Sequence, residues 1–267
     1  MAAGVKPRVF TFLSAAKPEE KQSMLINLAA SLMRVGSDVM VVDACSSGSG
    51  MVSQMDIRPV ASLLEVARGE RAIEEAIHAT SAGFQYAALT RGRSPSNMEG
   101  SALNAVFARL QQYADVLMVD AELGGQGELP VAAMAEGEIV VQVTSHPDSI
   151  KQAYVLVKQL HGQLGRRSFG VLVTDASEKD AQRVFANLAQ TASRYLAVEL
   201  RMIGAVPADE HMNRAVKLER PVVEAFPLAA ASVAFRQIAG WFAQQSAMYG
   251  KPSSWAGQND ELMLAGA

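Results

Sequence analysis

Short apolar runs alternate with longer amphipathic segments along this chain, and that alternation restricts its fold more than any other feature of the sequence. The apolar runs are residues 9–13, 39–43, 116–120, 138–143, 169–173 and 202–206. Apolar residues at helical spacing mark segments 21–35, 102–113, 149–161, 178–195 and 228–245. Nearly continuous apolar strands separated by helices are typical of a parallel sheet covered on both faces. The sequence therefore predicts an α/β fold, doubly wound, with a mostly parallel sheet and helices on both faces.

The chain has 267 residues, of which 49% are hydrophobic. That apolar content supplies a core and excludes a disordered protein. We expect a single α/β domain over 1–248, because no linker-like stretch interrupts it, and a polar, flexible tail over 249–267. No apolar run approaches the ~18 residues of a membrane span, and no secretory leader is visible, so we expect a cytoplasmic protein.

The charge and the rare residues exclude several classes of function. The formal net charge is −3, so no basic excess indicates nucleic-acid binding. Cys45 is the only cysteine, which excludes an intramolecular disulfide, and the four histidines are scattered. We therefore expect no nucleic-acid partner and no resident metal ion.

The turn after the first predicted strand is the natural phosphate site of such a fold, since ligands bind beyond the carboxyl ends of the strands. A phosphate cradle needs glycines for its wrapped backbone, a lysine that reaches the phosphate, and a hydroxyl for Mg²⁺. Residues 14–23 read SAAKPEEKQS. This turn contains Lys17 and Lys21 but no glycine.

Residues 9–43 resemble the deviant Walker A ATPases of the MinD/ParA family, and especially its FlhG (FleN)-like branch. Asn27-Leu28-Ala29 matches a piece of that family's first helix, and 220–227 matches a stretch common in FlhG-like proteins. The resemblance extends from residue 8 to residue 245. It implies a P-loop NTPase-like, MinD-like fold, with ATP or ADP and Mg²⁺ as ligands and with dimers that enclose ATP.

The family loop, KGGxGKT, aligns without gaps onto residues 16–22. The resemblance then places Lys21 at the Walker lysine and Gln22 at the Mg²⁺-binding threonine, while the Ser23 hydroxyl lies one residue late. Ala16 takes the place of the signature lysine, unless a shorter loop brings Lys17 there. The three glycine positions hold Lys17, Pro18 and Glu20.

The resemblance also assigns residues at later strand ends. Asp43 and Asp120 correspond to residues near Mg²⁺, and Cys45 stands where the family has a water-activating aspartate. Pro207 and Asp209 keep the turn beside the nucleotide base. At two further positions this chain differs from the family. Glu122 stands where the family has a switch glycine, and Thr174 stands where it has an asparagine that contacts adenine.

Elementary electrostatics argues against a triphosphate in this loop. Pro18, Glu19 and Glu20 make an ordinary helix start, where carboxylates interact favourably with the helix dipole. A carboxylate ~5 Å from a phosphate charge repels it by roughly 3 kcal/mol at an effective dielectric constant of ~20. Hydrolysis is disfavoured further, because Gln22 is a poor Mg²⁺ ligand and a cysteine at its ordinary pKa is mostly a neutral thiol. We therefore expect no catalytic residue.

Structural roles compete with these assignments. Lys21 is more simply interpreted as a solvated helix lysine. Asp43 and Asp120 are more simply interpreted as caps of the turns that follow their strands.

The last predicted helix admits two interpretations. It carries four large apolar residues, Phe235, Ile238, Trp241 and Phe242. MinD-type proteins touch membranes with a C-terminal amphipathic helix, which implies weak membrane contact here. We favour a helix packed on the domain, because its polar face is not rich in lysine or arginine.

The leading hypothesis is a MinD/FlhG-like regulatory protein with a degraded ATP site. It requires no cofactor, binds Mg²⁺ only if nucleotide binds, and acts on other proteins, such as flagellar placement factors. We expect a monomer or a dimer formed without nucleotide. Two alternatives stay open: an active ATPase that uses Lys17 or Lys21 with Asp120, and a binding module that retains ATP or ADP beside Pro207 and Asp209.

Overall fold

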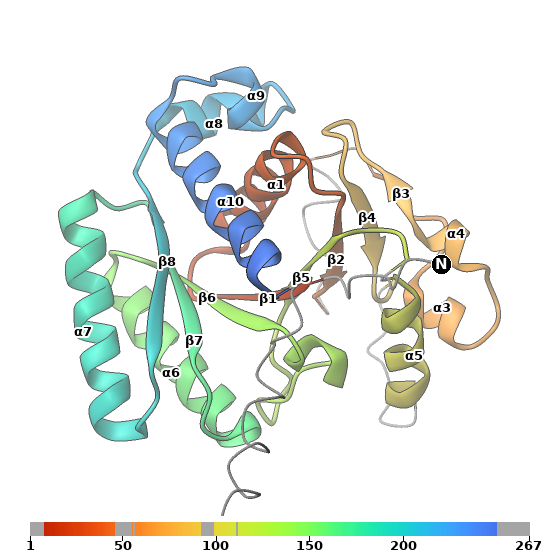
Figure 1. Ribbon diagram of the computed structural model, residues 1–267, viewed down its shortest axis with the longest axis horizontal. Helices are drawn as coiled ribbons and strands as arrows, with labels where there is room; N and C mark the ends of the chain where they lie inside the picture. The colour runs from red at the N-terminus through yellow and green to blue at the C-terminus, as the bar shows by residue number, and fades with distance from the viewer. Residues whose placement is uncertain (1–7, 46–54, 56, 92–98, 111, 250–267) are drawn as a thin grey trace, which may run out of the picture.

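The computed structural model describes residues 8–45, 55, 57–91, 99–110 and 112–249. These residues form an eight-stranded sheet in the order β3-β4-β2-β5-β1-β6-β7-β8 (Figure 1). Every pair of neighbouring strands is parallel except β3 and β4, which are antiparallel. The strands are β1 (Arg8–Ser14), β2 (Val39–Ala44), β3 (His78–Ala79), β4 (Gln85–Ala88), β5 (Val116–Ala121), β6 (Glu138–Thr144), β7 (Phe169–Thr174) and β8 (Leu200–Val206).

Helices cover both faces of the sheet, as the alternation of segments predicts. One face carries α1 (Pro18–Arg34) and α10 (Ala230–Tyr249), which lie side by side in Figure 1, with α8 (Glu210–Lys217) and α9 (Val222–Ala225) at their end. The helices on the other face are α3 (Leu63–Ala67), α4 (Ile73–Ala76), α5 (Gly100–Leu110), η2 (Ala132–Ala135), α6 (Pro147–Leu164) and α7 (Glu178–Leu196). The predicted doubly wound fold is confirmed.

The central strand β1 shows why both faces need a helical layer. Successive side chains of a strand point to opposite faces. Phe10 and Phe12 are buried with α1 and α10, whereas Val9 and Leu13 are buried with the helices of the other face. All four are apolar, so neither face of the strand can be left in water without exposing hydrophobic surface.

Helix α10 packs on the domain through its large apolar residues. Phe235, Ile238 and Phe242 are buried against α1 and the sheet. The Phe242 ring meets Phe10 edge to face, with ring centroids 4.4 Å apart. The Arg8 guanidinium donates a hydrogen bond to the Phe242 carbonyl at 2.6 Å. Among the described helices, none has the length and hydrophobicity needed to cross a bilayer.

The structure adds elements that periodicity does not predict. All six predicted strands are present, but β3 and β4 are too short, at two and four residues, to give a clear apolar run. Helix α1 begins at Pro18, three residues before the predicted periodic segment. The predicted tail lies outside the described residues apart from Tyr249.

Candidate functional site

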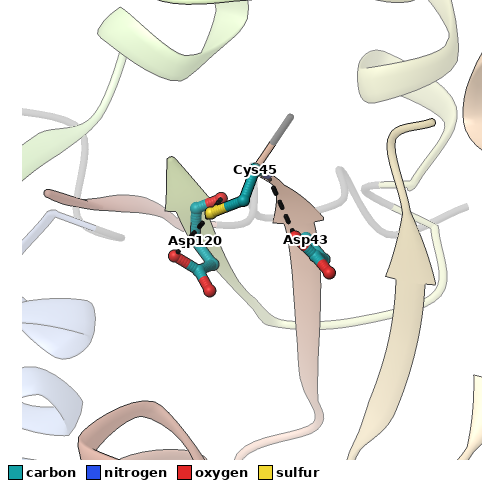
Figure 2. Close-up of side chains that lie close together, drawn as sticks. All are labelled: Asp43, Cys45 and Asp120. Carbon is teal, nitrogen blue, oxygen red and sulfur yellow. Dashed lines mark hydrogen bonds between the residues drawn. The ribbon is translucent and has the colours of Figure 1, made fainter. Parts of the chain in front are cut away.

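Two aspartates lie next to each other at the carboxyl edge of the sheet. Strand β2 pairs with β5 in parallel, in a register that sets Asp43 opposite Asp120. Cys45 follows β2 directly, and Figure 2 shows its sulfur turned toward Asp120. One ligand atom from each of these residues lies within 4.8 Å of the others. The strand order therefore brings Asp120 next to Asp43 and Cys45, which lie much earlier in the chain.

Lys21 completes this group from the first turns of α1. Its ammonium forms an ion pair with the Asp120 carboxylate and donates a hydrogen bond to the Ala121 carbonyl at 2.7 Å. The paired side chains are only 7% and 1% exposed. The interpretation of Lys21 as a solvated helix lysine is therefore wrong. Burial, the largest effect on Asp120, raises the pKa of its carboxyl, while the Lys21 ammonium acts in the opposite direction.

The Cys45 thiol is held between the lysine and the two aspartates. Its Sγ lies 3.2 Å from Asp120 Oδ1 and 3.9 Å from Lys21 Nζ. Burial raises the pKa of this thiol, and the Lys21 ammonium offsets only part of that shift. The thiol is therefore a neutral donor to Asp120, rather than a nucleophile or a base.

Asp43 holds the turn after β2, the structural role weighed from the sequence. Its Oδ1 accepts a hydrogen bond from the Cys45 backbone N–H at 3.1 Å. Its Oδ2 accepts one from the Tyr86 hydroxyl at 2.9 Å. The same structural role was expected for Asp120, but its carboxylate pairs with Lys21 instead of holding the turn after β5.

The loop between β1 and α1 turns its amides toward the protein. The Ala15 N–H donates to the Gln142 carbonyl at 2.9 Å, and the Ala16 N–H donates to Ser14 Oγ at 2.9 Å. The Lys17 N–H points to Glu20 Oε2 at 3.4 Å. Pro18, the next residue, has no N–H. Four successive residues of the loop therefore present no unpaired backbone donor to a ligand.

A cavity of about 650 Å³ lies beside this loop and the Lys21–Asp120 pair. Among the residues that the structure describes, the charged side chains that line it are Lys21 and three carboxylates, those of Glu19, Asp120 and Glu122. Glu19 and Glu122 are exposed, whereas Lys21 and Asp120 are buried. The lining therefore carries more negative than positive charge.

The predicted residues of the loop divide between two sides of α1. Gln22 is buried and lines the cavity. Ser23 lines a separate, small recess next to Asn27 and Pro221, so its hydroxyl does not reach the cavity. Lys17 is exposed at the start of α1 and is not among the residues that line the cavity.

A buried hydrogen-bond chain joins the loop to the ends of two neighbouring strands. Ser14 Oγ donates to Gln142 Oε1 at 2.9 Å, and Gln142 Nε2 donates to Thr174 Oγ1 at 3.0 Å. Thr174 Oγ1 thus accepts a hydrogen bond within the protein, and Thr174 is not among the residues that line the cavity. Gln142 is not among the site residues predicted from the sequence, although a glutamine inside the apolar run 138–143 is a visible signal of a buried polar contact.

Pro207 and Asp209 lie between β8 and α8, away from the cavity lining. Asp209 caps α8: its Oδ1 accepts from the His211 N–H at 2.9 Å and lies 2.7 Å from His211 Nδ1. Its Oδ2 accepts from the Ala231 N–H at 3.0 Å. Burial alone would raise the pKa of Asp209, but these hydrogen bonds together lower it. Both carboxylate oxygens are therefore occupied by the protein itself.

Comparisons with known proteins give one relative close enough to define a family. No protein-family model matches the chain. The sequence is 30% identical over 224 residues to the antiactivator FleN of Pseudomonas aeruginosa, which covers 82% of this chain and 80% of FleN.

Solved structures share the fold. One is the MinC:MinD cell division protein complex of Aquifex aeolicus, with a TM-score of 0.67, 19% identity, and coverage of 89% of this chain and 96% of that one. Another is MinD of Pyrococcus horikoshii with Mg-ADP, with a TM-score of 0.66, 17% identity, and coverage of 92% and 100%. At such identities these structures establish the fold alone.

Proposed function

The chain belongs to the MinD/ParA family, close to FleN, and on that premise we propose that it is a regulatory protein that acts through contacts with other proteins and does not turn over ATP. The relative named FleN is an antiactivator, which is a regulatory role. A MinD with the same fold is found in a complex with MinC. We further propose that the process is the control of flagellar number or placement.

The Lys21–Asp120 ion pair is the observation that carries the proposal. A lysine that holds phosphate must present its ammonium to the ligand. Here that ammonium is used by Asp120 and the Ala121 carbonyl. Phosphate binding would have to break a buried ion pair and leave Asp120 uncompensated, which costs about 3–5 kcal/mol.

The remaining residues of the cavity fit Mg-ATP poorly. The loop amides are paired with Gln142, Ser14 and Glu20, so no wrapped cradle of N–H groups is available. The described part of the lining carries three carboxylates against one ammonium. A polyanion would meet net repulsion there. We therefore assign no step of the function to bound nucleotide.

Calorimetric titration of the full chain with Mg-ATP tests this proposal. We expect no saturable heat at nucleotide concentrations up to roughly 1 mM, because repulsion and the occupied lysine both oppose binding. Micromolar affinity for Mg-ATP would contradict the proposal. Phosphate release that disappears in Lys21→Ala would establish an active ATPase instead.

The size of the cavity favours one alternative, a protein that retains a nucleotide as a fixed structural ligand. A volume of about 650 Å³ is within the range of small-molecule sites. Mass spectrometry of the denatured, freshly purified protein distinguishes this alternative. A stoichiometric amount of ATP or ADP would support it, and the absence of nucleotide supports the leading proposal.

A further inference from the structure

An exposed apolar surface lies beside α8 and the start of α10, at the end of the domain where these helices meet in Figure 1. Leu228 is 92% exposed and Leu218 is 55% exposed. Leu218 lies four residues after Arg214 on the same side of α8, and the exposed Val233 lies three residues before Arg236 on α10. We call this the α8–α10 surface, which consists of Arg214, Leu218, Phe226, Leu228, Val233 and Arg236.

Two arginines hold the segment that carries the most exposed leucine. The Arg214 guanidinium lies over the Phe226 ring, 4.9 Å from its centroid. The Arg236 Nη1 donates a hydrogen bond to the Pro227 carbonyl at 2.7 Å. Leu228 follows directly, so an apolar side chain is presented to solvent beside two positioned guanidinium groups. Apolar, aromatic and arginine side chains in one place are typical of protein interfaces.

The charge of the two arginines is not balanced by an ion pair within the described residues. Arg183, Arg201 and Arg220 each pair with an acidic side chain. Neither Arg214 nor Arg236 forms such a pair with any carboxylate that the structure describes. A guanidinium has five N–H donors in a planar fork that matches a carboxylate. The ring and carbonyl contacts leave most of these donors for a ligand.

This chemistry favours a protein segment over the other possible occupants. A second copy in a two-fold dimer would bring the same two arginines against this surface, which is unfavourable. An anionic bilayer presents negative charge everywhere, so it would also meet the exposed carboxylates of Glu210 and Glu219 beside α8. A peptide segment instead places individual carboxylates at the two guanidiniums and apolar side chains between them.

We infer that the α8–α10 surface binds a segment of a partner protein in which apolar side chains are flanked by aspartate or glutamate. This inference rests on the proposed function, because it assumes that the protein acts through contacts with other proteins. Leu228 supplies the apolar contact, and Arg214 and Arg236 supply bidentate contacts to two carboxylates.

Selection from a phage-displayed library of random dodecapeptides on the full-length protein tests the inference. We expect the selected peptides to combine leucine, isoleucine or phenylalanine with aspartate or glutamate. Fluorescence polarisation of a selected, fluorescein-labelled peptide then gives its affinity for each variant. We expect Arg214→Gln, Arg236→Gln and Leu228→Ser each to weaken binding by about five- to tenfold.

Two matched controls change similar groups elsewhere on the protein. Arg194→Gln removes a guanidinium that lies 5.4 Å from the centroid of the exposed Tyr195 ring on α7. Val155→Ser removes an exposed apolar side chain of α6. Neither should change peptide binding. The inference is overturned if the selected peptides lack acidic residues, or if the control variants weaken binding as much as the variants of the α8–α10 surface do.

Further measurements distinguish the occupants and the hypotheses. Cosedimentation with phosphatidylserine vesicles that is lost in Leu228→Ser would assign the surface to a membrane, and a dimer lost in that variant would assign it to a second copy. Either result overturns the inference. If selected peptides bind equally well to Arg214→Gln, Arg236→Gln and Leu228→Ser, the inference fails while the proposed function stands. Micromolar binding of Mg-ATP to the wild type would contradict the proposed function, whatever the peptides do.

Discussion

The Lys21 ammonium and the Asp120 carboxylate form an ion pair that is almost completely removed from water. The pair joins the beginning of α1 to the end of β5. Removing two charges from water is unfavourable, and only their mutual attraction and further hydrogen bonds compensate it. Replacing one partner alone should therefore lower the free energy of unfolding more than replacing both partners with apolar residues.

We predict that Lys21→Met lowers the free energy of unfolding by about 3–5 kcal/mol, because Asp120 is left buried without its cation. The double variant Lys21→Met, Asp120→Leu should recover most of that loss. Urea denaturation at neutral pH measures both. Lys158→Met, at an exposed position of α6, is the control and should shift the free energy by less than about 0.5 kcal/mol. Equal destabilisation by both lysine variants would refute this account.

Asn27 gives a second stability prediction. Its Oδ1 accepts a hydrogen bond from the Val222 N–H at 2.6 Å, and its Nδ2 donates to the Ser23 carbonyl at 2.7 Å. Asn27→Ala leaves the buried Val222 N–H unpaired, so we expect a loss of about 1–3 kcal/mol. Asn187→Ala, at an exposed position of α7, is the matched control. Similar denaturation midpoints for the two variants would show that the hydrogen bond from Val222 in α9 to Asn27 contributes little to stability.

These contacts show where sequence reasoning succeeds and where it stops. The apolar runs predict the six longer strands, because buried parallel strands need apolar residues on both faces. The loop composition correctly predicts an ordinary helix start at Pro18. The pairing of Lys21 with Asp120 depends on strand order and loop path, which no local pattern specifies. For the same reason, the sequence does not show that Gln142 links Ser14 to Thr174.

Asp209 should make the stability of the protein depend on pH. Its pKa is lowered in the folded state, so its contribution is present above the ordinary carboxyl pKa of about 4 and is lost as the pH falls through the folded-state value. We predict that Asp209→Asn destabilises the protein at pH 7 and that the difference from the wild type shrinks toward pH 3. Urea denaturation at both pH values measures it. A difference that stays constant with pH would rule out the carboxylate as its source.

Cys45 should react slowly with alkylating agents. Burial raises the pKa of its thiol, so little thiolate is present at pH 8. We predict that iodoacetamide modifies the folded protein more than about tenfold more slowly than the urea-unfolded chain. Mass spectrometry at timed intervals provides the rates. Modification at the same rate in both states would mean that the thiol is an accessible, reactive group.

The loop itself can be tested by restoring the family pattern. The variant combines Ala16→Lys, Lys17→Gly, Pro18→Gly, Glu20→Gly and Gln22→Thr. Glycines free the backbone to wrap a phosphate, and the threonine supplies a hydroxyl for Mg²⁺. We expect calorimetry to show tighter binding of Mg-ATP to this variant than to the wild type, but affinity weaker than micromolar, because the Lys21–Asp120 pair and the Glu19 and Glu122 carboxylates remain. Addition of Lys21→Ala should abolish that binding. If the restored loop binds no nucleotide, the departures of this loop from the family pattern do not by themselves explain why Mg-ATP fits the wild-type cavity poorly.

The packing of α10 on β1 has a consequence for how this chain is made. Arg8 and Phe242 are joined by a hydrogen bond although 234 positions separate them. The Phe10 ring lies in β1 and is covered by α10, which is synthesised much later than β1. Until α10 has been synthesised, the central strand keeps an uncovered aromatic surface. A nascent chain of this kind is prone to association, and truncations within α10 should yield insoluble protein.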